Sequence, residues 1–104
     1  MTIQLNTDKS LTIHQEYETK IQTQITDALS RFNDLITRLE VHLSDENGSK
    51  DGLDDKRCLL EAKIAGKEPI AVTNFGDTYD LAITGALTKM KSALEKVAGK
   101  MKSH

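Results

Sequence analysis

The sequence predicts an α+β fold in which a four-stranded mixed sheet carries two helices on one face. Apolar and polar residues alternate in four short segments, at 2–7, 35–44, 57–65 and 70–73. Apolar residues recur at helical spacing in two longer segments, one beginning at Thr12 and the other near Gly76 or Asp77. The length of 104 residues fits one small domain, so we expect residues 1–104 to fold together.

The first strand, which contains Ile3, is followed by a helix with a recognisable start. Thr12 and Gln15 have the spacing of a capping box, in which the hydroxyl accepts a free backbone N–H and the amide reaches back. One apolar face follows, made by Tyr17, Ile21, Ile25, Ala28, Leu29 and Phe32. Asn33 and Asp34 are predicted to end the helix.

Period-two alternation returns in the two middle strands. In the segment 35–44 the inward residues are Leu39, Val41 and Leu43. In the segment 57–65 they are Cys58, Leu60, Ala62 and Ile64. Arg57 and Lys63 therefore lie on the outward side of the third strand. The acidic, glycine-containing segment 45–55 between the strands is predicted to be a loop.

A turn over Gly66–Pro69 leads into the last strand, 70–73. Pro69 belongs at the start of that strand because it has no N–H for the ladder. The second helix has acidic residues near its start, where the helix dipole favours them. Its apolar stripe is made by Tyr79, Ile83, Ala86, Leu87, Met90, Leu94, Val97 and Met101.

The element order is therefore β-α-β-β-β-α. A strand–helix–strand start predicts a right-handed crossover to a parallel partner, and the next two connections are short enough for antiparallel hairpins. Each helix has one apolar face, so both are expected to pack on the same side of the sheet.

Composition excludes several classes of protein. Fourteen Lys and Arg stand against sixteen Asp and Glu, a net charge of −2, so the chain is not globally basic. Its one cysteine allows no internal disulfide. No apolar run approaches the ~20 residues that span a bilayer, and the N-terminus lacks the pattern of a secretory signal. We expect a cytoplasmic protein without a membrane partner.

The near-neutral total hides a strong asymmetry of charge. Residues 40–55 carry six acidic side chains against one lysine. Residues 56–67 carry four basic side chains against one acidic, and residues 89–102 carry five lysines against Glu95. The basic residues are thus concentrated on the third strand, the following turn and the last helix.

The lysines of the last helix form two lines. At ~100° per residue, Lys89, Lys96 and Lys100 share one flank of the apolar stripe, and Lys91 and Lys102 share the other. The surface between them is small and uncharged: Gly85, Thr88, Ser92, Gly99 and Ser103. A phosphate backbone could approach it closely, with ammonium groups on both sides. The alternative is that these lysines only border a solvated helix and extend over its core.

Catalytic and metal-binding patterns are missing from the sequence. His14, His42 and His104 fall on a helix start, an outward strand position and the chain end, which predicts no metal site. Cys58 is predicted to pack as a small apolar residue. No glycine-rich phosphate loop, serine elbow or base beside a nucleophile is present. We therefore expect no enzyme, no cofactor and no small-molecule substrate.

Three segments resemble a known family in sequence and in order. They are FNDLITRLEVHLSDEN from Phe32, CLLEAKI from Cys58 and DTYDLAITGALTKMKSALEK from Asp77. Together they are similar to the ribosome hibernation-promoting factor and RaiA family, once called sigma-factor modulation proteins. The resemblance covers nearly the whole chain.

This resemblance implies a fold similar to double-stranded-RNA-binding domains. It also implies binding to the small ribosomal subunit, in the channel for messenger and transfer RNA, where occupancy blocks translation and basic side chains hold ribosomal RNA phosphates. Lys89 and Lys96 fall on lysines typical of the family's last helix. The further RNA-binding candidates are Lys91, Lys100, Lys102, Arg57 and Lys63.

Departures from the family pattern leave a second interpretation open. Gln24 and Ala28 stand where members often carry lysines, and fewer phosphate contacts mean weaker, less salt-sensitive binding. The alternative is a regulatory protein-binding module of the same fold with a changed partner, using the loop 45–55 or the strand edge at 70–73. The sequence lacks the family's second, ribosome-pairing domain, so we expect a monomer acting on single ribosomes.

Overall fold

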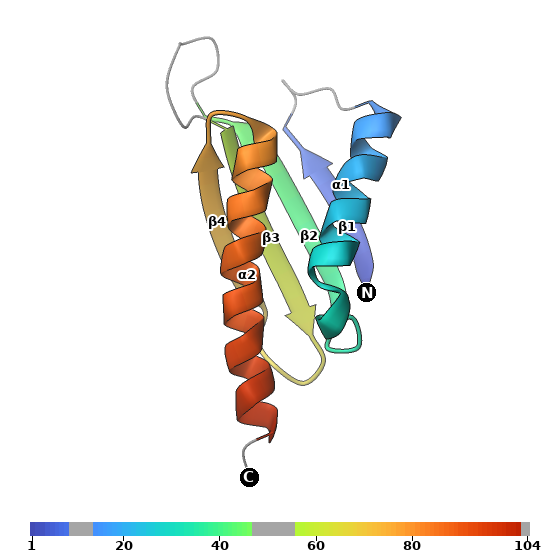
Figure 1. The fold of residues 1–104 in the computed structure, drawn as a ribbon, viewed down its shortest axis with the longest axis vertical. Helices are drawn as coiled ribbons and strands as arrows, with labels where there is room; N and C mark the ends of the chain where they lie inside the picture. Colours follow the sequence, from blue (N-terminus) through green and yellow to red (C-terminus); the bar gives the residue numbers. More distant parts are fainter. Residues whose placement is uncertain (9–13, 47–55, 103–104) are drawn as a thin grey trace.

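The computed structural model describes residues 1–8, 14–46 and 56–102. Of residues 101 and 102 it describes only the backbone. The elements follow the predicted order (Figure 1). They are β1 (Thr2–Thr7), α1 (Gln15–Ala28), the single 3-10 turn η1 (Ser30–Phe32), β2 (Ile36–Asp45), β3 (Lys56–Ile64), β4 (Ile70–Gly76) and α2 (Tyr79–Lys102). The predicted α+β class and the order β-α-β-β-β-α are confirmed.

The four strands form one mixed sheet in the order β1-β2-β3-β4. β1 pairs in parallel with β2, with Ile3 opposite Leu39, and the other two pairs are antiparallel. A register shift between Ile36 and Arg38 leaves a bulge at Thr37, whose hydroxyl donates to the backbone oxygen of Lys63 at 3.0 Å. The parallel pairing of β1 with β2 and the two antiparallel pairs are therefore as predicted.

Both helices cover the same face of the sheet, and the core lies between the two layers (Figure 1). Most of the residues predicted to point inward are buried, among them Val41, Leu60 and Ile83. Tyr17, Tyr79 and Val97 are half-buried. The two helices run in the same direction, and the last turns of α2 project past the end of the sheet (Figure 1). Neither of the described helices lies on the opposite face of the sheet.

The first helix is shorter than predicted at its C-terminal end. It stops at Ala28, and the 3-10 turn that follows places the N–H of Phe32 on the backbone oxygen of Leu29 at 2.9 Å. This tighter turn keeps Leu29 and Phe32 on the buried side, which is why they continue the helical spacing in the sequence. His14 is the N-cap, and the predicted capping residue Thr12 lies outside the described residues.

The second helix begins later than predicted because β4 continues to Gly76. Thr78 caps the helix, since its Oγ1 accepts the backbone N–H of Leu81 at 3.1 Å. The turn between β3 and β4 uses Gly66 with φ of +73°, a conformation that side chains with a Cβ rarely adopt. Along the described helices, none is long and apolar enough to cross a membrane.

Candidate nucleic-acid interface

The structure separates the predicted basic residues into two groups on opposite faces of the molecule. Five lie on α2, on the helix side of the sheet. Arg57 and Lys63 lie on β3 and alternate with the buried residues Cys58, Ala62 and Ile64, so their side chains are on the open face. The two lysine lines and the β3 cations therefore do not form one patch.

The flank of α2 that carries Lys89 faces the edge strand β4. The Lys89 Nζ donates to the backbone oxygen of Thr73 at 2.8 Å. Lys96 and Lys100, seven and eleven residues further on, share this side of the helix and are exposed. Within the described part of the chain, neither forms an ion pair or a hydrogen bond through its side chain.

The other flank of α2 faces α1. Asp80 on this flank accepts a hydrogen bond from the Tyr17 hydroxyl at 2.8 Å and lies 3.8 Å from the Lys20 Nζ. Glu95 lies 3.7 Å from Arg31. Lys91 is exposed between these contacts, and no described residue pairs with its ammonium group. The side chain of Lys102 lies outside the described residues.

The surface between the lysine lines differs from the prediction at Gly85. A Cβ at this position would overlap the side-chain amide of Asn74, so Gly85 faces β4 rather than solvent. Thr88, Ser92 and Gly99 are exposed as predicted. The small, uncharged surface therefore begins one turn later along α2.

The free edge of β4 is partly closed by side chains. Positions 73 and 75 point their backbone oxygens to the same side of the strand. The Lys89 Nζ donates to the backbone oxygen of Thr73. The Asn74 Nδ2 donates to the backbone oxygen of Phe75 at 3.2 Å. It also donates to the backbone oxygens of Leu81 and Ala82 on α2, at 3.4 and 3.3 Å. Occupied carbonyls disfavour the addition of a partner's strand here. The other surface of the alternative interpretation, the acidic loop, lies mostly outside the described residues.

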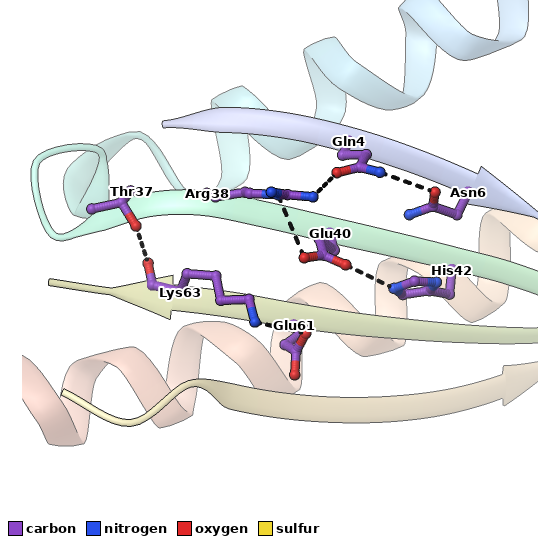
Figure 2. Close-up of polar contacts among 8 residues, drawn as sticks. All are labelled: Gln4, Asn6, Thr37, Arg38, Glu40, His42, Glu61 and Lys63. Carbon is purple, nitrogen blue, oxygen red and sulfur yellow. Dashed lines mark hydrogen bonds and ion pairs between the residues drawn. The ribbon is translucent and has the colours of Figure 1, made fainter.

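The open face of the sheet is polar and internally paired (Figure 2). The Glu40 carboxylate lies 3.4 Å from the Arg38 Nε and 3.4 Å from the His42 Nε2. Arg38 also donates to Gln4, whose amide donates to the Asn6 Oδ1 at 3.3 Å. This chain of contacts links β1 to β2.

The two β3 cations of the open face also have acidic neighbours. Lys63 lies 3.5 Å from Glu61, and Arg57 lies 3.9 Å from Glu46. Among the described cations, Lys89, Lys91, Lys96 and Lys100 on α2 have no acidic partner, and neither has Lys67 in the turn after β3.

Two titratable side chains that pack against the core, Cys58 and Tyr17, have a raised pKa. Burial raises the pKa of Cys58 to about 12 from its ordinary value of 9.0, so the thiol stays protonated at neutral pH. Burial, followed by the hydrogen bond to Asp80, raises the pKa of Tyr17 well above its usual range. Both groups support packing, in line with the predicted role of Cys58.

Phe75 is an exposed residue that lies beyond the predicted end of the last strand. The residue is 48% exposed and precedes the buried Gly76. The sequence predicts a strand that ends at Thr73, so it assigns Phe75 to neither face of the sheet. Its signal was the continued alternation of Ile70, Val72 and Asn74, which places Phe75 on the open side.

Comparison with known proteins gives the family. The sequence model of the sigma 54 modulation protein / S30EA ribosomal protein family matches residues 6–102. The chain belongs to this family. Its members are ribosome-associated modulation proteins. No curated protein matches the chain significantly.

Two solved structures of similar fold agree with this family. The N-terminal domain of Protein Y from Thermus thermophilus is 18% identical, with a TM-score of 0.72 over 93% of this chain and 99% of that one. A ribosomal subunit interface protein from Coxiella burnetii is 17% identical, with a TM-score of 0.73 over 95% and 99%. At these identities the likeness concerns the fold alone.

Proposed function

We propose that this protein binds the small ribosomal subunit through ribosomal RNA and inhibits translation by occupying the channel for messenger and transfer RNA. Family membership over residues 6–102 carries the proposal. The similar structure from Coxiella burnetii bears the name of a ribosomal subunit interface protein, which points to the same partner. Residues 1–104 act as one domain in the cytoplasm, without chemistry of their own.

The unpaired lysines of α2 are the proposed contacts with RNA. Lys91, Lys96 and Lys100 flank a surface of small residues on helix turns that partly project beyond the sheet. An ammonium group without an acidic neighbour is available to a phosphate without first breaking an ion pair. Arg57 and Lys63 would need to exchange a carboxylate for a phosphate, which makes them secondary contacts.

Lys89 has a different part in this proposal. Its ammonium is held on the Thr73 oxygen and carries its charge to the β4 edge. An ammonium has three N–H donors, so it can contact a phosphate and keep this bond. Together with the Asn74 contacts, the occupied edge favours a monomer.

A pair of charge reversals tests the proposal. Lys96→Glu should weaken binding to purified small subunits at low salt by about tenfold or more, because it replaces a phosphate contact with repulsion. The matched control is Lys20→Glu, an equal change of charge at a residue already 3.8 Å from Asp80. Added parent protein should also inhibit cell-free translation, and Lys96→Glu should inhibit less. Equal binding by both variants would remove α2 from the interface.

A further inference from the structure

An exposed aromatic ring lies on the open face of the sheet at its free edge. Phe75 pairs across the strands with Arg57, so the two side chains share that face. Among the described residues, cations lie over the rings of Phe32 (Arg31, 4.9 Å) and Tyr79 (Lys56, 6.0 Å), and none over Phe75. The ring is therefore an apolar surface open to a ligand.

A shallow hollow of about 220 Å³ lies toward the β1 side of Arg57. It is lined by Asn6, Thr7, Asp8, His42, Leu43, Ser44 and Arg57. The Nδ2 of Asn6 is buried and has no acceptor among the described residues. Figure 2 shows Asn6 and His42 side by side on the open face. The hollow thus contains a hydrogen-bond donor without an acceptor, an imidazole and a guanidinium, together with the carboxylate of Asp8.

The hollow, Arg57 and Phe75 follow one another across all four strands. Strands lie ~4.8 Å apart, so this row is about 14 Å long. The ion pair that holds Arg57 is long, 3.9 Å, and its partner Glu46 is half-exposed. An incoming anion can therefore replace that carboxylate at small cost.

We propose that this row binds unpaired nucleotides of an RNA strand, with a base stacked on Phe75 and its phosphate on Arg57. The inference rests on the proposed ribosomal function and adds a second contact surface to it. Aromatic rings on an open sheet are a common platform for unpaired bases, and an adjacent cation holds the backbone. The Asn6 amide supplies a donor for a base or sugar oxygen of the neighbouring nucleotide.

A single-tryptophan protein tests stacking directly, because the chain contains no tryptophan. Phe75→Trp should show saturable fluorescence quenching when a short single-stranded oligoadenylate is added. The matched control is Leu81→Trp, on α2, where the native residue is 56% exposed. Quenching at position 75 alone supports the proposal. Absence of saturable quenching at position 75, or equal quenching at both positions, overturns it.

Substitutions at Phe75 separate stacking from a general apolar contact. Phe75→Ala should weaken oligoadenylate binding by about tenfold, and Phe75→Tyr should retain it, because one stacked base contributes this order of affinity. Phe75→Leu keeps apolar area without a π face. If Phe75→Leu binds like the parent, the ring does not stack on a base, and an apolar protein contact becomes the better explanation.

Glu46→Gln gives a prediction of the opposite sign. It removes the carboxylate that competes with phosphate for Arg57, so oligoadenylate should bind several-fold more tightly. Unchanged or weaker binding by Glu46→Gln would contradict the assignment of the phosphate to Arg57.

The two proposals fail separately. Saturable quenching of Phe75→Trp without binding to small subunits would leave the stacking site and reject the ribosomal function. Binding to small subunits that depends on Lys96 but not on Phe75 would support the ribosomal function and reject the stacking site.

Discussion

Cys58 shows how burial at one position controls a chemical property. The thiol lies near the start of β3, on the strand's inward side, and is fully buried. Its pKa of about 12 is raised by burial, and the neighbouring charge of Arg57 lowers it only in part. A buried, protonated thiol contributes packing and no reactivity.

This shift predicts a loss of stability at alkaline pH. The folded pKa is above the ordinary value of 9.0, so the stabilisation is complete below about pH 9 and is lost as pH rises toward 12. The free energy of unfolding should fall by up to about 1.4 kcal/mol per pH unit from this group. Urea unfolding of the parent and of Cys58→Ala between pH 8 and pH 10 measures it. If the free energy of unfolding depends on pH in the same way in both proteins, Cys58 is not the group that destabilises the fold at alkaline pH.

Residue positions in the core were predictable from the sequence, whereas the partners of charged residues were not. Alternation placed Leu39, Val41 and Cys58 inward, because strand periodicity alone decides that. The contact of Lys89 with Thr73 depends on how α2 crosses β4, which no local pattern contains. The same holds for Gly85, which the helical wheel placed outward and the fold places against Asn74.

At the scale of elements, the strand β4 is the exposed edge that the molecule protects. Two of its carbonyls are occupied by side chains, from Lys89 and Asn74. Lys89→Ala should leave stability within about 1 kcal/mol, because the bond it removes is exposed. It should increase self-association, because an unprotected edge pairs with another copy.

Sedimentation at increasing protein concentration measures this effect. Lys96→Ala is the matched control, since it removes the same charge from the same side of α2 without freeing a carbonyl. Lys89→Arg should restore the parent behaviour. If Lys89→Ala remains as monomeric as Lys96→Ala, the contact with Thr73 has no protective role.

Element ends were harder to predict than element types. α1 ends at Ala28 because a 3-10 turn preserves the apolar spacing beyond the helix, and spacing cannot distinguish the two. β4 extends to Gly76 because the polar side chain of Asn74 donates to backbone oxygens of α2 and can therefore face inward. Because Asn74 is polar, the sequence predicts that the strand ends at Thr73, three residues before its end in the structure.

At the scale of the whole molecule, the topology decides which basic residues act together. The order of helices and strands predicted that both helices share one face, and this is confirmed. It follows that α2 and the outward residues of β3 are on opposite sides. The sequence indicated two basic segments correctly, but their separation follows only from the packing of the layers.

The central claim is that cations of α2 hold ribosomal RNA phosphates, and salt dependence tests it most directly. The measurement is co-sedimentation of the protein with small subunits over a range of monovalent salt. Three unpaired lysines predict that the logarithm of the binding constant falls with the logarithm of salt concentration with a slope of about −2 to −3. Binding that does not change with salt, or no co-sedimentation at the lowest salt, would contradict the claim.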